Sequence, residues 1–97
     1  MPTVDASPVV LAQRALALHP QVALRPEPFG ALAYHYGNRR LLFLRHRDLV
    51  AVVECLADHP TLESAFDACA IAKARRPGFE AAIASMIESG MLRDRAD

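Results

Sequence analysis

The fold is decided by residues 31–44, which read ALAYHYGNRRLLFL. Two runs of largely apolar residues stand on either side of the dipeptide Gly37-Asn38. A pair that begins with Gly is typical of a two-residue hairpin turn. We therefore predict two antiparallel strands, over Ala31–Tyr36 and Arg39–Leu44, joined by that turn.

A two-residue turn also fixes the register of the hairpin. It predicts three facing pairs, which are Tyr36 opposite Arg39, Tyr34 opposite Leu41, and Leu32 opposite Phe43. The alternate residues form the second face, namely Ala31, Ala33, His35, Arg40, Leu42 and Leu44. Because the later strand is apolar on both faces near its end, we expect a cover on the second face. The N-terminal arm, a second subunit or a ligand would each provide it.

A further strand precedes this hairpin. Residues 21–25 alternate in polarity, with Val22 and Leu24 on one face. Pro26 and Pro28 are expected to end its ladder, and Gly30 gives the chain freedom to turn. The three segments together predict a three-stranded antiparallel meander.

Three helices are expected after the sheet. Asp48, Thr61 and Pro77 are typical of the three helix starts, and Gly90 of the last helix end. The apolar stripes of the three helices are Leu49, Val52, Val53 and Leu56; Leu62, Ala65, Phe66 and Cys69; and Phe79, Ala82, Ile83, Met86 and Ile87. After Gly90, Met91 and Leu92 return to the core or add a short extended piece. The order of elements predicts an α+β domain, in outline a three-stranded sheet followed by a winged-helix-like bundle of three helices.

The composition suits one small domain. The chain has 97 residues, 53% of them apolar, and a formal net charge of zero. Such a chain folds without staples and is not intrinsically disordered. We expect an arm or short helix over residues 1–18, with Ser7-Pro8 as a helix start before Val9–Leu18, a domain over residues 19–93 and a tail over residues 94–97. No basic region precedes an apolar run at the N-terminus, which favours a cytoplasmic protein with no membrane segment.

Catalytic and metal-binding patterns are absent from the sequence. The four histidines are scattered at expected turns and strand edges, without the spacing of a metal pair. Nucleophile elbows, phosphate loops and zinc-protease motifs are also missing, so we expect no catalytic residue, no metal and no cofactor. Cys55 and Cys69 are expected to be buried reduced thiols, and a disulfide or a metal pair is the alternative.

Positive charge gathers around the last predicted strand. Arg39, Arg40, Arg45 and Arg47 bracket it, and no acidic residue lies between Glu27 and Asp48. A second basic cluster, Lys73, Arg75 and Arg76, precedes the last helix. These residues form either a solvated positive face or a frame for an anionic partner.

A peptide suits this frame better than a nucleic acid. The helix that would enter a DNA groove, Pro77–Ser89, carries Glu80 and Glu88 and no Lys or Arg. An edge strand, in contrast, offers unpaired N–H and C=O groups to an extended peptide. The runner-up function is a winged-helix nucleic-acid-binding or regulatory module.

The residues also resemble a known family. Residues 19–37, HPQVALRPEPFGALAYHYG, together with residues 39–44, RRLLFL, and 48–53, DLVAVV, resemble the small chaperones of mycofactocin biosynthesis. These chaperones are similar to the PqqD-like recognition domains of ribosomally made, modified peptides. The resemblance covers residues 19–92 and is most specific across the hairpin. The chain departs from it directly after the last strand, where Arg45-His46-Arg47 stands in place of a polar capping residue.

The resemblance implies a non-catalytic peptide chaperone. Such a domain binds the leader of a precursor peptide as an added strand and presents the peptide to a radical S-adenosylmethionine (SAM) maturase. Carried over by element, the peptide-binding residues would be Arg40, Leu41, Leu42, Phe43, Leu44, Arg45, Phe79, Ile83, Met86 and Ile87. The apolar members of the last helix also suit a plain core role. Tyr34 and Tyr36 suit half-buried positions in the sheet or, alternatively, a surface for self-association into a homo-oligomer.

Overall fold

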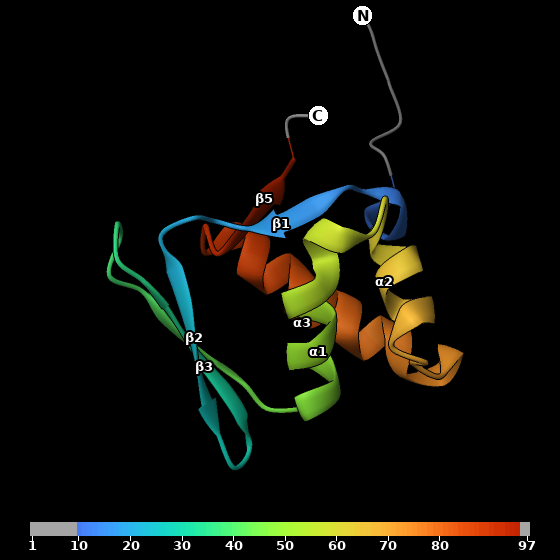
Figure 1. Cartoon of the computed structure of the whole chain (residues 1–97), viewed down its shortest axis with the longest axis horizontal. Helices are drawn as coiled ribbons and strands as arrows, with labels where there is room; N and C mark the ends of the chain where they lie inside the picture. The colour runs from blue at the N-terminus through green and yellow to red at the C-terminus, as the bar shows by residue number, and fades with distance from the viewer. Residues whose placement is uncertain (1–9, 96–97) are drawn as a thin grey trace, which may run out of the picture.

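The computed structural model describes residues 10–95 and confirms the predicted α+β class, with a three-stranded antiparallel sheet followed by three α-helices. The sheet lies on one side of the molecule and the helices on the other (Figure 1). The strands and α-helices are β1 (Leu16–Leu18), β2 (Val22–Glu27), β3 (Gly30–His35), β4 (Leu41–Leu44), α1 (Arg47–Cys55), α2 (Leu62–Ala68), α3 (Arg76–Glu88) and β5 (Leu92–Asp94). Within residues 10–95 there are also three short 3-10 helices, η1 (Leu11–Gln13), η2 (Leu56–Asp58) and η3 (Lys73–Arg75).

The three-stranded sheet has the order β2-β3-β4, and the predicted register is confirmed where β3 and β4 pair. Leu32 faces Phe43, and Tyr34 faces Leu41. The prediction that Pro26 ends the first ladder is wrong, because β2 continues to Glu27 opposite Gly30. The Tyr36 N–H bonds to the Gln21 carbonyl, and since bonded pairs alternate, the nitrogen of Pro26 points away from β3. An edge strand tolerates proline in that position.

The β3–β4 connection differs from the predicted two-residue turn. The loop runs from Tyr36 to Arg39, with the His35 N–H donating to the Arg40 carbonyl at 3.0 Å. The positive φ of 63° lies at Arg39 rather than at Gly37. The Nδ1 atom of His35 accepts hydrogen bonds from the Gly37 and Asn38 N–H groups, at 2.9 and 3.1 Å, and so holds the wider loop. The register of the two strands is still the predicted one. A four-residue loop between His35 and Arg40 sets the same residues opposite each other as a two-residue turn between Tyr36 and Arg39 would.

Helix α1 covers the inner face of the sheet, so the prediction that the N-terminal arm, a second subunit or a ligand covers this face is wrong. Leu49, Val52 and Val53 of α1 are buried in one core with the buried residues of β3 and β4. Leu56, the last residue of the predicted stripe, is buried in the same core. The prediction that Asp48 caps this helix is wrong, because the N-cap is His46, which makes no side-chain capping bond. Asp48 lies in the first turn, and its carboxylate accepts a hydrogen bond from Arg75 at 2.7 Å.

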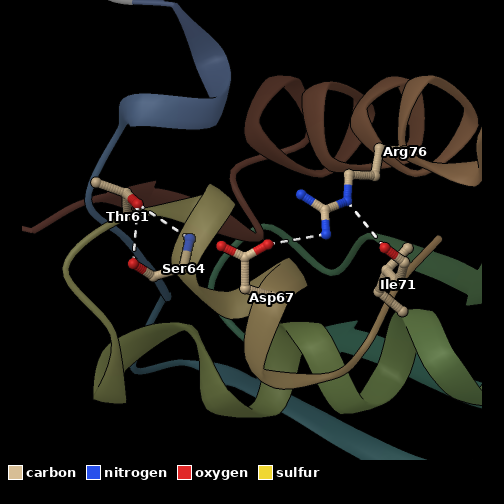
Figure 2. Close-up of polar contacts among 5 residues, drawn as sticks. All are labelled: Thr61, Ser64, Asp67, Ile71 and Arg76. Carbon is tan, nitrogen blue, oxygen red and sulfur yellow. Dashed lines mark hydrogen bonds and ion pairs between the residues drawn. The ribbon is translucent and has the colours of Figure 1, made fainter. Parts of the chain in front are cut away.

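Helix α2 begins where the sequence predicted and is tied to α3 (Figure 2). The Thr61 Oγ1 atom accepts a hydrogen bond of 3.1 Å from the Ser64 N–H, as an N-cap does. Arg76, at the start of α3, bonds Asp67 on α2 and the Ile71 carbonyl, each at 2.9 Å. These contacts hold the first turn of α3 in place.

Helix α3 ends at Gly90, as predicted, in a Schellman motif. Gly90 has a φ of 78°, its N–H donates to the Ile87 carbonyl, and the Met91 N–H donates to the Met86 carbonyl. The chain then returns to the core, where Met91 and Leu92 are buried.

A second, two-stranded sheet was not predicted. Where an arm or a short helix was expected before residue 19, the described residues form η1 and then β1, whose Leu16 faces Asp94 of β5. Arg14 forms a bidentate pair with Asp94, at 2.9 and 2.7 Å, and this hydrogen bonding lowers the pKa of that carboxyl. Strand β1 lies just before residue 19, the expected start of the domain. The expected helix start at Ser7-Pro8 lies outside the described residues.

Candidate functional site

The site begins at the outer edge of β4. Bonded and non-bonded pairs alternate along an antiparallel ladder, and the His35–Arg40 pair is bonded. The backbone groups of Leu42 and Leu44 therefore face β3, and those of Leu41 and Phe43 point away from it. Within residues 10–95, no strand pairs with this edge. The outward N–H and C=O groups of Leu41 and Phe43 are available to an added strand.

A groove of about 470 Å³ lies beside the end of β4, between that strand, the start of α1 and the first half of α3. Its floor is apolar, with Leu49 and Phe79 buried. Its lining residues are Phe43, Arg45, His46, Leu49, Ala74, Arg75, Gly78, Phe79 and Ala82. The groove thus combines an apolar floor with basic residues at its rim.

Contacts join both ends of α3 to the segments that precede and follow β4. At the loop end, the Asn38 side-chain amide donates to the Ser89 carbonyl at 3.0 Å. At the other end, the His46 ring lies against the Phe79 ring, with centroids 5.7 Å apart. The end of α3 is therefore near the start of β4, and its start is near the end of β4. Within the groove itself, Phe43 and Arg45 lie on the β4 side, and Gly78, Phe79 and Ala82 lie on the α3 side.

Arginines mark the rim. Arg45 is exposed, and its guanidinium lies 5.9 Å from the centre of the Phe43 ring. Arg75 lies 4.9 Å from the centre of the Phe79 ring and also pairs with Asp48. An exposed pair of this kind contributes about 0–1 kcal/mol, so an acidic ligand can compete for Arg75 at little cost.

The predicted site residues fall into three groups. Four are exposed along the edge of β4 or next to it, namely Arg40, Leu41, Phe43 and Arg45. Leu42 and Ile87 are partly buried against the core, and Phe79 lines the groove. The remaining three, Leu44, Ile83 and Met86, are buried in the core and do not line the groove.

Sequence reasoning did not assign six of the lining residues. These are His46, Leu49, Ala74, Arg75, Gly78 and Ala82. Arg75 belongs to the second basic cluster, so charge gave one usable indication. Gly78 gave another, because a Cβ built on it meets no atom within 4 Å, and the helix face there is open. The others are assigned only by the packing of α3 against α1.

The cysteines and histidines form no metal site in the described part of the chain, where no group of three His, Cys, Asp or Glu could hold an ion. Cys55 and Cys69 are free thiols with their Sγ atoms 3.6 Å apart. Partial burial and the hydrogen bond between them raise the pKa of Cys55 to about 11. Desolvation, followed by the nearby His35 and Arg93, lowers the pKa of His19. No helix among residues 10–95 has the length and hydropathy to cross a membrane.

The fold and the site define a small α+β binding domain with an open strand edge beside an apolar groove. Residues 15–93 match the model of the peptide chaperone MftB family. The peptide chaperone MftB of Mycolicibacterium smegmatis is 49% identical over 75 residues, which cover 77% of this chain and 74% of that protein. That of Mycobacterium tuberculosis is 46% identical over 79 residues, 81% of this chain and 72% of that protein. That of Mycobacterium ulcerans is 47% identical with the same coverage.

The chain therefore belongs to the peptide chaperone MftB family. Its role is that of a peptide chaperone, and membership of this family makes it a non-catalytic protein. No solved structure matches the chain at a significant level.

Proposed function

We propose that the chain binds the leader of a ribosomally made precursor peptide of the mycofactocin type and presents it to a radical SAM maturase. The leader adds as a strand along β4. The observation that carries this proposal is the outward-facing backbone of Leu41 and Phe43 beside the groove. Main-chain hydrogen bonds to such an edge provide affinity, and pockets for alternate side chains provide specificity.

An added strand would place its side chains alternately on two sides. One set points toward the groove, where Leu49, Phe79 and Ala82 offer an apolar surface. The other set lies on the outer face of the sheet, next to Leu41 and Phe43. The leader should therefore carry an apolar anchor for the groove and carboxylates near Arg40 and Arg45.

The expected affinity is moderate. A disordered leader loses about 2–5 kcal/mol on ordering. A strand of about five or six residues with two or three anchors then leaves a net of about −8 kcal/mol, which is about micromolar. Binding should weaken with salt, since the arginines at the rim are exposed.

Two further features support a peptide ligand rather than DNA. Helix α3 forms one wall of the groove, and its only charged residues beyond the first turn are Glu80 and Glu88. Both would repel phosphates. The free thiols of Cys55 and Cys69 also suit a reducing compartment, and we place the protein in the cytoplasm with its maturase.

Calorimetric titration of the purified chain with a synthetic mycofactocin-type precursor peptide tests the proposal. We expect saturable binding at about micromolar affinity that survives removal of the peptide's C-terminal core. A peptide with the leader residues in scrambled order is the control. Equal binding of the scrambled peptide, or no binding by the folded chain, would overturn the proposal.

A further inference from the structure

The outer face of the three-stranded sheet is apolar and aromatic. Several of its residues are well exposed, with Tyr36 at 62%, Leu41 at 58%, Phe43 at 56% and Phe29 at 42%. Leu32 and Tyr34 lie between them and are half-buried. Within residues 10–95 the helices cover only the opposite face, which carries Ala31, Ala33 and Leu44 (Figure 1). An exposed apolar group of this kind marks an interaction surface.

Ring contacts organise this outer face. Tyr34 and Tyr36 meet edge to face at 4.9 Å between centroids, and Phe29 and Phe43 do the same at 5.7 Å. Phe29, Phe43 and Arg45 line a hollow of about 240 Å³. Phe43 and Arg45 also line the groove beside β4. The outer face and the groove are therefore continuous through these two residues.

The charged residues around the outer face indicate which kind of partner can bind it. Arg39 is exposed in the β3–β4 loop, Arg45 is exposed at the end of β4, and Arg25 lies on the outer face of β2. Glu27 is the acidic residue beside them, and it pairs with Arg25 at 2.7 Å. A second copy of this chain would bring two arginine rims together, which disfavours self-association. The surface fits a protein with an apolar patch and acidic residues around it.

The first residues of the chain do not suit this face either. The described chain begins at Val10, and η1 contacts α2 and α3 on the helical side of the molecule (Figure 1). Residues 1–9 contain one acidic residue, Asp5, against the three arginines Arg25, Arg39 and Arg45. The occupant is therefore expected to come from another protein.

We propose that this outer face, together with alternate side chains of the peptide bound along β4, is the docking surface for the maturase. This inference rests on the proposed function. A strand added to β4 extends the sheet, and every second peptide residue then lies in the same plane as Leu41 and Phe43. The maturase contacts a composite surface, part chaperone and part peptide. Peptide binding and maturase binding therefore strengthen each other.

The test uses substitutions on β3, the central strand, so that the edge of β4 is unchanged. Leu32→Thr combined with Tyr34→Thr removes apolar surface and keeps residues that favour strands. Tyr36→Ser, in the loop, is a second variant that leaves the strands intact. Val10→Thr is the matched control, because Val10 is an equally exposed apolar residue away from the sheet. Peptide affinity and maturase affinity are both measured, the latter with and without peptide.

We expect the double variant to bind the peptide within about twofold of the unsubstituted chain and to lose about tenfold or more in affinity for the maturase. Tyr36→Ser should lose less, and Val10→Thr nothing. For the unsubstituted chain, peptide should tighten maturase binding by about fivefold or more.

Unchanged maturase affinity in both sheet variants would overturn the docking surface and leave the proposed function standing. Failure of the unsubstituted chain to bind peptide would instead overturn the proposed function, and the docking inference with it. Two other occupants have their own readouts. If the unsubstituted chain sediments as a dimer and Tyr36→Ser abolishes the dimer, the outer face is a surface for self-association instead. If the unsubstituted chain binds a single-stranded oligonucleotide and Tyr36→Ser abolishes that complex, the outer face binds nucleic acid instead.

Discussion

The Asn38 side-chain amide donates a hydrogen bond of 3.0 Å to the carbonyl oxygen of Ser89, 51 residues later in the chain. It joins the β3–β4 loop, which precedes β4, to the end of α3, whose first half lines the groove. The Oδ1 atom of the same side chain accepts the Arg40 N–H at 2.9 Å. One residue therefore shapes the start of the β4 edge and fixes the helix beside it.

This relationship gives the first prediction. Asn38→Ala should lower the free energy of unfolding by about 1–2 kcal/mol and weaken peptide binding, because it removes both hydrogen bonds. Asn38→Asp keeps the acceptor for the Arg40 N–H and loses the donor to Ser89. Urea unfolding and calorimetry separate the two effects. If Asn38→Asp binds peptide as well as the unsubstituted chain, the tie to α3 is not needed for the groove.

The direction of the backbone groups on β4 gives the second prediction. Leu41→Pro removes an outward N–H and should weaken peptide binding by about tenfold or more with the domain still folded. Leu41→Ala keeps the N–H and controls for the lost side chain. Leu42→Pro should instead destabilise the domain by about 2 kcal/mol or more, because its N–H faces Ala33. Circular dichroism measures the folding of the two proline variants, and calorimetry measures their peptide binding. The assignment would be wrong if Leu41→Pro destabilised the domain and Leu42→Pro weakened only peptide binding.

The basic rim gives the third prediction. Arg40→Glu combined with Arg45→Glu should weaken peptide binding by about tenfold and reduce its dependence on salt, since two attractive contacts become repulsive. Both side chains are exposed, so the thermal midpoint should change little. Arg93→Glu, on the exposed part of β5, is the control for a change of net charge. Unchanged affinity in the double variant would remove the arginines from recognition.

Two residues with positive φ give a matched pair of stability predictions. Ala70 ends α2 with a φ of 56°, and Gly90 ends α3 with a φ of 78°. Ala70→Gly should stabilise the protein by about 1 kcal/mol, because glycine adopts this conformation without the Cβ penalty. Gly90→Ala should destabilise it by a similar amount or more, since the new Cβ would lie 3.2 Å from Nδ2 of Asn38. Thermal unfolding of both variants is the measurement, and opposite signs are required.

The cysteine pair gives a prediction on pH. The pKa of Cys55 is raised to about 11, so its alkylation by iodoacetamide should be slow at pH 8 and keep rising well above pH 9. Folding favours the neutral thiol, and this contribution to stability is lost as the pH rises from the ordinary thiol value through 11. Cys69→Ser should bring the pKa of Cys55 closer to its ordinary value, because the thiol partner is gone. A fast, pH-independent reaction in the unsubstituted chain would contradict the raised pKa.

The sequence predicted what depends on local periodicity and termini. Leu49, Val52 and Val53 are buried as their spacing required, Thr61 caps α2, and Gly90 ends α3. The site was predicted only in part. The sequence predicted the edge segment Leu41–Leu44 as a whole, whereas His46, Gly78 and Ala82 enter the groove through the tertiary packing of α3 near the end of β4 and the start of α1. Which residues of α3 face the groove depends on the rotation of the helix, and its apolar stripe is wide enough to allow more than one.

By itself, the sequence determined the class of the fold, the order of the three-stranded sheet and the three α-helices, and the register of the hairpin, because each depends on residues close together in the chain. The tertiary structure decided the rest. It formed β1 where an arm or a short helix was expected, because this segment pairs with β5 at the other end of the chain and buries Leu16 in the core. It also determined that Leu41 and Phe43, not Leu42, turn their backbone groups outward. That choice depends on which pair of the ladder is hydrogen-bonded, and the loop held by His35 sets it.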